Sequence, residues 1–340
     1  MTVKVACLGA GYFSRFHIDG WERLDGANLV GVADNDLQRA TETGHPAFSA
    51  LSPMLDATQP DILDIIVPPA AHEAAIQTAL DYGIRTIVCQ KPFCGDLETA
   101  TRVTSAAKAQ GATLIVHENF RFQPWYRAIK AAMEAGDIGD PLQASFRLRP
   151  GDGQGADAYL ARQAYFQTMP RFLVHETAVH YIDVFRYMFG DFANVYADLY
   201  RDNPVIAGED AGIIQFQHQS GPRSLFDGNR LLDHAAENTR CTMGEGLFEG
   251  TQGSLTLFGD GSVYLRRFGS ESAQEILSKS TATTFGGDCT YHLQAHVLRH
   301  LLKNVPLENV ASDYLYVMMA EGAIYRSAHE GQKVKLDGQK

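Results

Sequence analysis

The residues Gly9-Ala10-Gly11-Tyr12-Phe13-Ser14 have the spacing of a dinucleotide-binding turn. They follow a short apolar run and open a helical pattern. The first glycine permits a tight turn, the second lets the backbone approach a pyrophosphate, and amide groups at the helix start face its charge. Ser14 stands where Gly or Ala is usual, a small departure that keeps a short side chain. The six residues therefore predict a loop that binds the phosphates of a dinucleotide.

A carboxylate stands where the ribose of such a cofactor would be bound. Asp34 ends the second apolar run, about twenty residues beyond the glycines, and is followed by Asn35 and Asp36. A carboxylate in this place accepts hydrogen bonds from both ribose hydroxyls and repels the 2′-phosphate of NADP. No arginine lies directly beside Asp34, although Arg39 lies one helical turn further on. The pattern favours NAD over NADP.

Glu176 and His180 are four residues apart in a segment, 172–189, that predicts a helix. At this spacing the two side chains share one face of the helix. A carboxylate one turn from an imidazole can orient the ring and raise its basicity, which suits a general base near neutral pH. The alternative is a structural Glu–His pair at the helix start. For Asp183, on the same face, we expect a structural hydrogen bond.

Lys91 follows an apolar run, 84–89, that predicts a buried strand. Ligands of open α/β sheets bind at the carboxyl ends of the strands, where this lysine would lie. Its ammonium could hold a substrate oxygen or the nicotinamide ribose, and the alternative is a solvated surface charge. Pro92 fixes the local turn, and the Lys91–Pro92 bond is a candidate cis peptide.

Short apolar runs alternate with helix-length segments in the first part of the chain. The strand-like runs are 3–8, 28–33, 61–67, 84–89 and 113–116, and the helical segments include 70–81 and 96–109. Asp96 is placed to cap the second of these helices. This alternation predicts a doubly wound parallel sheet, and we assign residues 1–120 to an NAD-binding Rossmann domain.

After residue 120 the pattern changes to that of an α+β domain, 121–340. Helices are predicted over 122–135, 172–189, 289–303 and 312–330, and strands over 193–200, 211–218, 223–229, 241–249, 253–258 and 262–267. Short turns join several of these strands, whereas a parallel crossover needs a dozen or more residues. We therefore expect an open antiparallel sheet packed with helices, which binds substrate and forms the oligomer contact.

The composition limits the partners of the protein. Among 340 residues, 40 acidic and 29 basic side chains give a net charge of −11, so nucleic acid and anionic membrane surfaces are not expected partners. Five cysteines without CxxC spacing suit a reducing compartment. The first residues run directly into a strand pattern, so we expect no secretion-type leader, and we expect no membrane span because no apolar run is long enough. The expected location is the cytoplasm.

Three further segments resemble motifs of the glucose–fructose oxidoreductase/inositol dehydrogenase family, also called Gfo/Idh/MocA. Val67-Pro68-Pro69-Ala70-Ala71-His72 is similar to its PPxxH motif, Cys89-Gln90-Lys91-Pro92 to its EKP motif, and 176–183 (ETAVHYID) to its DxGxHxxD helix. Weaker similarities lie at 119–122 (NFRF) and 249–254 (EGTQGS). Gln90 replaces the usual Glu and removes a charge beside Lys91, and Glu176 replaces the usual Asp and adds one methylene.

The resemblance implies site residues beyond those argued above. It adds cofactor contacts from the PPxxH, EKP and NFRF segments and substrate contacts from residues near the predicted helix 172–189. The implied cofactor residues are Pro68, Pro69, His72, Gln90, Lys91 and Asn119; the implied substrate residues are Lys91, Arg121, Arg171, His175 and His180. For Arg171 the alternative is an ion pair with a surface acid.

The implied function is an NAD-dependent dehydrogenase that oxidises a secondary alcohol or hemiacetal of a sugar, cyclitol or polyol. Lys91, Glu176 and His180 are the implied catalytic residues. Two alternatives remain: an NAD-dependent glycosidase that recycles its cofactor, and a non-catalytic regulator that senses a sugar or dinucleotide. An open sheet tends to pair with its own copy, so a homodimer or homotetramer through the second domain is expected.

His292, His296 and His300 repeat at helical spacing and raise the possibility of a metal site. Two imidazoles at i and i+4 can share one zinc ion, but no cysteine or carboxylate is placed locally to complete the site. We therefore expect no metal.

Overall fold

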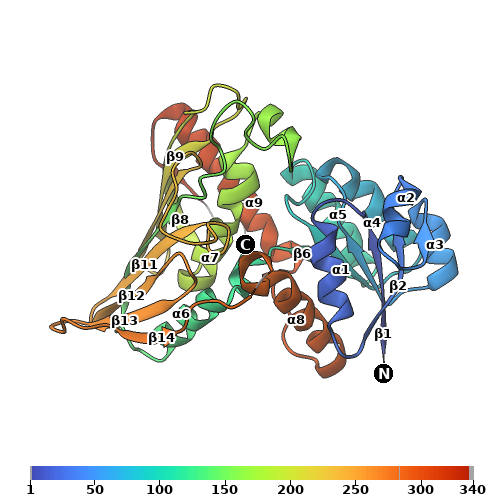
Figure 1. Cartoon of the computed structure of the whole chain (residues 1–340), viewed down its shortest axis with the longest axis horizontal. Helices are drawn as coiled ribbons and strands as arrows, with labels where there is room; N and C mark the ends of the chain where they lie inside the picture. The colour runs from blue at the N-terminus through green and yellow to red at the C-terminus, as the bar shows by residue number, and fades with distance from the viewer. Residues whose placement is uncertain (1, 283, 337–340) are drawn as a thin grey trace. The chain divides into compact units, whose positions relative to one another are not determined.

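The computed structural model of the chain describes residues 2–282 and 284–336. The chain divides into two compact units (Figure 1). Unit 1 contains residues 1–119 and 290–318, and unit 2 contains residues 120–289 and 319–340. The chain therefore leaves unit 1 close to the expected boundary at residue 120 and later returns to it, a return that the sequence does not indicate.

Unit 1 is built on a parallel sheet of six strands in the order β3-β2-β1-β4-β5-β6. The strands are β1 (Val3–Leu8), β2 (Ala27–Ala33), β3 (Ala47–Phe48), β4 (Ile62–Ile65), β5 (Thr86–Gln90) and β6 (Thr113–His117). The strand order reverses beside β1, since its neighbours are β2 and β4. At such a point the loops at the carboxyl ends of the strands part and form a crevice for a ligand. The predicted doubly wound sheet is confirmed.

The helices of unit 1 lie between these strands and after residue 289. They are α1 (Ser14–Glu22), α2 (Leu37–Glu42), α3 (Leu51–Thr58), α4 (His72–Asp81), α5 (Leu97–Ala109) and α8 (Cys289–Lys303). The predicted cap of α5 is confirmed, because Asp96 Oδ1 accepts a hydrogen bond of 2.8 Å from the Thr99 amide. The two-residue strand β3 and the short helices α2 and α3 carry too few residues to show a clear period in the sequence.

Unit 2 is built on a sheet of nine strands in the order β14-β13-β12-β11-β7-β10-β9-β8-β15. The strands are β7 (Pro141–Leu148), β8 (Phe192–Tyr200), β9 (Ala211–His218), β10 (Arg223–Asn229), β11 (Gly244–Gly250), β12 (Gly253–Leu257), β13 (Val263–Arg267), β14 (Gln274–Leu277) and β15 (Val334–Lys335). The expected antiparallel pairing holds except for one pair. β7 and β10 run parallel, with Phe146 beside Phe226. The turn-length argument does not apply to them, because a long connection through a helix and two strands separates them.

Helices α6 (Pro124–Glu134) and α7 (Val179–Phe189) pack on one face of this sheet. The ring of Tyr181, on α7, lies 4.2 Å from that of Phe146 and 5.1 Å from that of Phe226, measured between centroids. The predicted helix 172–189 is divided, because residues Leu173–Ala178 form a π-helix before α7 begins. The long helix α9 (Ala311–Glu330) starts in unit 1 and ends in unit 2. Within 2–282 and 284–336, no helix is long and apolar enough to cross a membrane.

A buried histidine at the end of β9 makes the stability of unit 2 depend on pH. His218 Nδ1 donates to the carbonyl of Gly190 (2.8 Å), and Nε2 accepts from the hydroxyl of Ser224 (2.9 Å). Burial lowers the pKa of His218 from its ordinary value of 6.5 to about 4. As the pH falls from 6.5 to about 4, the unfolded chain binds a proton at His218 that the folded chain does not. The free energy of unfolding therefore decreases over this range of pH.

We expect His218→Asn to reduce this loss. The variant should be less stable at neutral pH, because asparagine can replace at most one of the two hydrogen bonds. The fall in its unfolding free energy between neutral pH and pH 4 should be smaller than in the wild type by up to roughly 3 kcal/mol. Denaturant titrations at stepped pH measure this difference, with His329→Asn at an exposed position as the control. Equal acid slopes in His218→Asn and the wild type would contradict the assignment.

Candidate functional site

The glycine loop leaves β1 and enters α1 with little free space beneath it. Gly9 has a φ of +107°, and a Cβ at this position would lie 2.6 Å from the carbonyl oxygen of Ile66. At Gly11, by contrast, a Cβ would meet no atom within 4 Å. The buried Ser14 donates its hydroxyl to the Gly11 carbonyl at 2.6 Å. The first glycine is therefore required by the close approach of two loops, and the second leaves the backbone open to a phosphate.

Asp34 ends β2 and links this strand to the glycine loop. Its Oδ2 accepts from the Ala10 amide at 2.7 Å, and its Oδ1 accepts from the Asp36 amide at 2.9 Å. Arg39 pairs with Asp36 at 3.3 Å and is exposed. A carboxylate has about four lone-pair sites, so Asp34 can hold the loop and still accept from ribose hydroxyls. Asn35 beside it is exposed. The loop and this carboxylate fit NAD.

His72, at the start of α4, joins two loops at the carboxyl edge of the sheet. Its Nε2 donates to the Val67 carbonyl at 2.8 Å, and its Nδ1 accepts from the Cys94 amide at 3.3 Å. Burial lowers the pKa of His72 to about 4, so the ring is neutral. The neighbouring Pro68 is exposed and Pro69 half-buried, and both precede α4. His72 thus holds the backbone of the loops that follow β4 and β5.

Gln90 ends β5 and Lys91 follows it, and the Lys91–Pro92 peptide is cis, as the sequence suggested. The side chain of Gln90 turns toward the protein interior. Its Oε1 accepts from the Lys91 amide at 2.7 Å, and its Nε2 lies 2.9 Å from His17 Nε2. Lys91 itself is half-buried. Asn119, buried at the end of unit 1, donates to the Thr290 hydroxyl at 3.3 Å.

In unit 2, His180 is buried on α7 with its ring held flat against Phe120. The two ring centroids are 3.8 Å apart and the planes differ by 3°. Arg121, the next residue, forms a two-bond ion pair with Asp183, in which Nε donates to Oδ2 at 2.7 Å and Nη2 to Oδ1. Asp183 thus has the structural hydrogen-bonding role that was expected of it, with Arg121 as its partner. Both members of this pair are buried.

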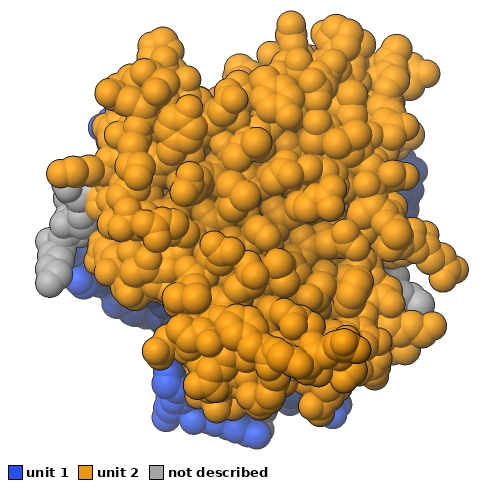
Figure 2. Space-filling view, turned by 90° about the vertical axis from the view of Figure 1, so that its left-hand side faces the viewer, with its two compact units in different colours: residues 1–119, 290–318 blue, residues 120–289, 319–340 orange. Residues whose placement is uncertain are grey.

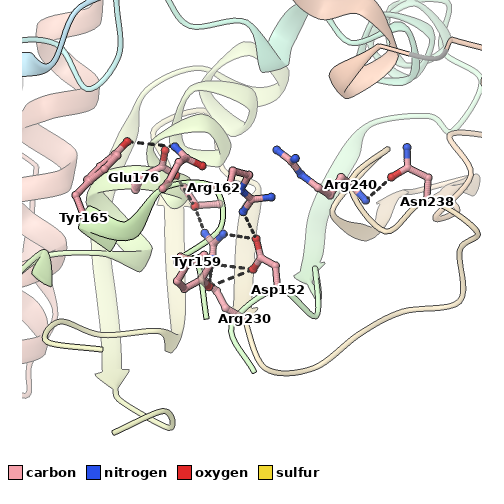
Figure 3. A network of polar contacts seen from close by, with 10 residues as sticks. Asp152, Tyr159, Arg162, Tyr165, Glu176, Arg230, Asn238 and Arg240 are labelled. Carbon is pink, nitrogen blue, oxygen red and sulfur yellow. Dashed lines mark hydrogen bonds and ion pairs between the residues drawn. The ribbon is translucent and has the colours of Figure 1, made fainter. Parts of the chain in front are cut away.

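Glu176 lies in the π-helix, one turn before His180. The buried Arg230 reaches it through Thr177. Glu176 Oε2 accepts from the Thr177 hydroxyl at 3.0 Å, and Thr177 in turn accepts from Arg230. Arg230 is only 2% exposed and also binds Asp152 at 2.8 Å and the Tyr159 hydroxyl at 2.7 Å (Figure 3). Burial alone would raise the pKa of Asp152, but Arg230 and Arg162 hold it below its ordinary value.

Arg171 and His175 contact the part of α9 that belongs to unit 2. The guanidinium of Arg171 lies 4.5 Å from the ring centroid of Tyr325, and His175 Nδ1 lies 2.7 Å from a carboxylate oxygen of Glu321. Arg171 is exposed and His175 half-buried. The contact that the structure describes for the Arg171 guanidinium is thus with an aromatic ring.

Two of the three spaced histidines on α8 bind backbone groups of the loop that follows this helix. His296 Nε2 accepts from the Glu308 amide at 3.0 Å, and His300 Nδ1 donates to the Val305 carbonyl at 2.8 Å. Their nitrogens therefore serve the fold of unit 1. In the described part of the chain, no three His, Cys, Asp or Glu side chains come together as a metal-binding group.

The structure gathers the expected site residues in two sets. In unit 1 the glycine loop, Asp34, His72 and Lys91 lie at the carboxyl edge of the sheet, and in unit 2 Glu176 lies on the π-helix and His180 on α7, which follows it directly. Sequence reasoning missed His17 and Asp64, both of which bear on the first set from within the core of unit 1. Asp64 did carry a signal, since a lone carboxylate within an apolar strand requires a buried partner.

Comparisons with known proteins agree with this architecture. Residues 3–118 match the family described as "Oxidoreductase family, NAD-binding Rossmann fold", and residues 126–256 match the GFO/IDH/MocA C-terminal domain. The chain is 31% identical to D-apiose dehydrogenase of Paraburkholderia graminis, over 98% of this chain and 89% of that protein. It is 28% identical to inositol 2-dehydrogenase of Mycolicibacterium gilvum, over 56% of this chain and 53% of that protein.

Among solved structures, an oxidoreductase from Agrobacterium radiobacter in complex with NAD+, L-tartaric acid and magnesium has a TM-score of 0.89 and 25% identity, covering 98% of each chain. The two matched domains span most of the described chain. The glycine loop and Asp34 agree with NAD, the cofactor in the description of the first matched domain. The chain belongs to the Gfo/Idh/MocA family of NAD-binding oxidoreductases that act on CH–OH groups.

Proposed function

We propose that the protein oxidises a secondary alcohol or hemiacetal of a sugar, cyclitol or polyol. The observation that carries this proposal is the identity of 31% with D-apiose dehydrogenase along 98% of the chain. A relative named for inositol, and a similar structure that holds L-tartaric acid, support a small substrate rich in hydroxyl groups. Since both units match, the resemblance extends to the part of the chain that would select the substrate.

Oxidation of a carbinol requires a hydride acceptor, a base for the hydroxyl proton and stabilisation of the developing alkoxide. NAD, when bound, supplies the acceptor. His180 takes the proton: its ring is buried and its plane is set by Phe120 at 3.8 Å. Lys91 stabilises the oxygen through its ammonium, on a backbone that Gln90 holds.

Glu176 is the positioning residue of this set. Its carboxylate is fixed through Thr177 by the guanidinium of Arg230, which is itself bound by Asp152 and Tyr159. A negative charge held one helical turn from His180 favours the imidazolium that forms when the base accepts its proton.

The test is to follow NADH absorbance while the protein acts on D-apiose, inositol, L-tartrate and a panel of other sugars. Net NADH separates a dehydrogenase from a cofactor-recycling glycosidase and from a regulator. We expect His180→Ala to lower kcat by roughly 10²–10⁴-fold, the usual contribution of a positioned base, with little change in NAD affinity. His329→Ala, at an exposed position of α9, is the control. Unchanged turnover combined with lost NAD binding would reverse the assignment of His180.

We expect cofactor selectivity to depend on Asp34. The double variant Asp34→Ser/Asn35→Arg removes the repulsion of a 2′-phosphate and adds a cation for it. The ratio of kcat/KM for NADP to that for NAD should rise by roughly tenfold or more, equivalent to about 1.4 kcal/mol. Asp34→Asn separates the two roles of this residue, because it keeps an acceptor for the Ala10 amide and loses the charge. A wild-type preference for NADP would overturn the proposal.

We place the reaction in the cytoplasm. The Cys7 and Cys89 thiols are buried in strands β1 and β5, and burial raises the pKa of both. Such thiols are unreactive and need no oxidising compartment.

We propose that the protein forms a homodimer or homotetramer through the open face of the unit 2 sheet. Figure 2 shows unit 2 from the side of this sheet. Large apolar side chains alternate outward along neighbouring strands, including Tyr196 at 40% exposure, Ile213 at 46% and Leu225 at 37%. Exposed apolar side chains on an open sheet face favour a contact between proteins, and a second copy of the chain presents the same face.

The double variant Ile213→Glu/Leu225→Glu should dissociate this assembly. Each change places a carboxylate that would be buried, unpaired, in the contact. We expect light scattering after size-exclusion chromatography to give a smaller mass than for the wild type, with unchanged circular dichroism. Leu302→Glu, at an apolar residue of α8 that is 41% exposed, is the matched control and should keep the wild-type mass. A double variant of wild-type mass would exclude this face.

A further inference from the structure

A chain of hydrogen bonds runs through the core of unit 1 and ends at the backbone of Lys91. It begins at Asp64, in the middle of β4, which is fully buried. Asp64 Oδ2 lies 2.8 Å from His17 Nδ1 and accepts from Trp21 Nε1 at 2.7 Å, both of which lie on α1. His17 Nε2 then lies 2.9 Å from Gln90 Nε2, and Gln90 Oε1 accepts from the Lys91 amide at 2.7 Å.

Only one placement of protons satisfies this chain. The Lys91 N–H is a donor, so the Gln90 atom that faces it must be the amide oxygen, which fixes the orientation of the amide. Gln90 Nε2, a donor without acceptor capacity, then faces His17 Nε2, which must accept. The single ring proton of His17 therefore lies on Nδ1 and is donated to Asp64. His17 is neutral in this arrangement.

Asp64 carries the negative charge of the chain. Burial alone would raise its pKa, but the hydrogen bonds that it accepts from His17 and Trp21 help to hold it below its ordinary value. The His117 ring lies 4.1 Å from that of His17, between centroids. α8 closes the group from another side, since Gln294 Nε2 donates to the His17 carbonyl at 3.0 Å. The residues of this group thus come from five different elements of one unit, β4, α1, β5, β6 and α8.

We propose that Asp64, His17 and Gln90 are positioning residues that hold Lys91, and that glutamine at position 90 keeps His17 in its neutral Nδ1–H form. The proposal rests on the role proposed above for Lys91. An ionised glutamate here could not donate to His17 Nε2, so the ring would take a second proton and lie as a cation between two carboxylates. Glutamine thereby avoids an additional buried ion.

The physical effect is to fix the base of a flexible side chain. A lysine ammonium ends a stem with four rotatable bonds, so its reach depends on where the main chain starts. Gln90 fixes the Lys91 amide, and His72 fixes the Cys94 amide three residues later. Both ends of this short segment are therefore attached to buried side chains, which reduces the freedom that the ammonium must lose in the reaction.

Two measurements test the chain without using catalysis. In protein labelled with ¹⁵N-histidine, long-range ¹H–¹⁵N spectra should contain one buried imidazole, absent from His17→Gln, with Nδ1 protonated and Nε2 unprotonated. In Gln90→Glu both nitrogens of this ring should be protonated. Hydrogen exchange at the Lys91 amide should become roughly tenfold faster in Gln90→Met and change less in Gln90→Glu, which keeps an acceptor oxygen. Gln77→Met, the same change at an exposed glutamine of α4, is the control.

Activity then separates this proposal from the one on which it rests. Gln90→Met should lower kcat by roughly tenfold with little change in NAD affinity, and Gln90→Glu should recover part of the loss. Lys91→Met tests the catalytic role alone: if it retains turnover, that role is wrong, while the spectra and exchange still decide the chain of bonds. A wild-type His17 that is cationic or protonated on Nε2 would overturn the inference. So would a Lys91 amide whose exchange is the same in Gln90→Met. The wild-type spectrum decides even if Gln90→Met does not fold.

Discussion

Backbone amides in the loops that leave a parallel sheet have no strand beside them, and each buried one needs a partner. In unit 1, side chains from the layer below provide these partners. Asp34 binds the Ala10 amide, His72 the Cys94 amide and Gln90 the Lys91 amide. The carboxyl edge of the sheet is thereby given a defined shape before any ligand arrives. Such preorganisation reduces the ordering cost that binding would otherwise carry.

Unit 2 meets a related requirement with a buried cation. Arg230 is nearly inaccessible, yet its guanidinium is bound by the Asp152 carboxylate, the Tyr159 hydroxyl and the Thr177 hydroxyl, and it lies 4.8 Å from the ring centroid of Phe172. Removing one partner of such a pair leaves an uncompensated charge, which is strongly destabilising. The segment before α7 is thus held by electrostatics as well as by apolar contacts, and Glu176 lies on this segment.

Much of the fold follows from local pattern. β1, β9, β10 and α8 begin and end at the predicted residues, because their apolar period and their flanking turns agree. β7 was missed although it lies at the centre of its sheet and its residues 142–148 (LQASFRL) alternate between apolar and polar, as a strand with one buried face does. Its parallel pairing with β10 depends on contacts between residues far apart in the chain, which a local pattern does not contain.

The candidate site likewise has parts that a local pattern predicts and parts that depend on contacts between distant residues. The glycine loop and Asp34 could be predicted because each residue type answers a local need of a phosphate or a ribose. The bonds of His17 with Asp64, and of Arg121 with Asp183, could not, since the partners lie 47 and 62 residues apart. Gln90 shows the intermediate case: the departure from the family motif was visible, but its meaning required the neighbours that the fold brings to it.

The return of the chain to unit 1 has a consequence for the order in which the protein is made. Residues 290–318 complete that unit and bring Gln294 to the carbonyl of His17. During synthesis the ribosome must therefore release all of residues 120–289 before the first unit has all of its parts. Domains usually complete folding in the order in which they emerge. Here the amino-terminal part of unit 1 must wait, incomplete, while residues 120–289 of unit 2 are synthesised, and unit 2 receives the segment that begins at residue 319 only after unit 1 has all of its parts.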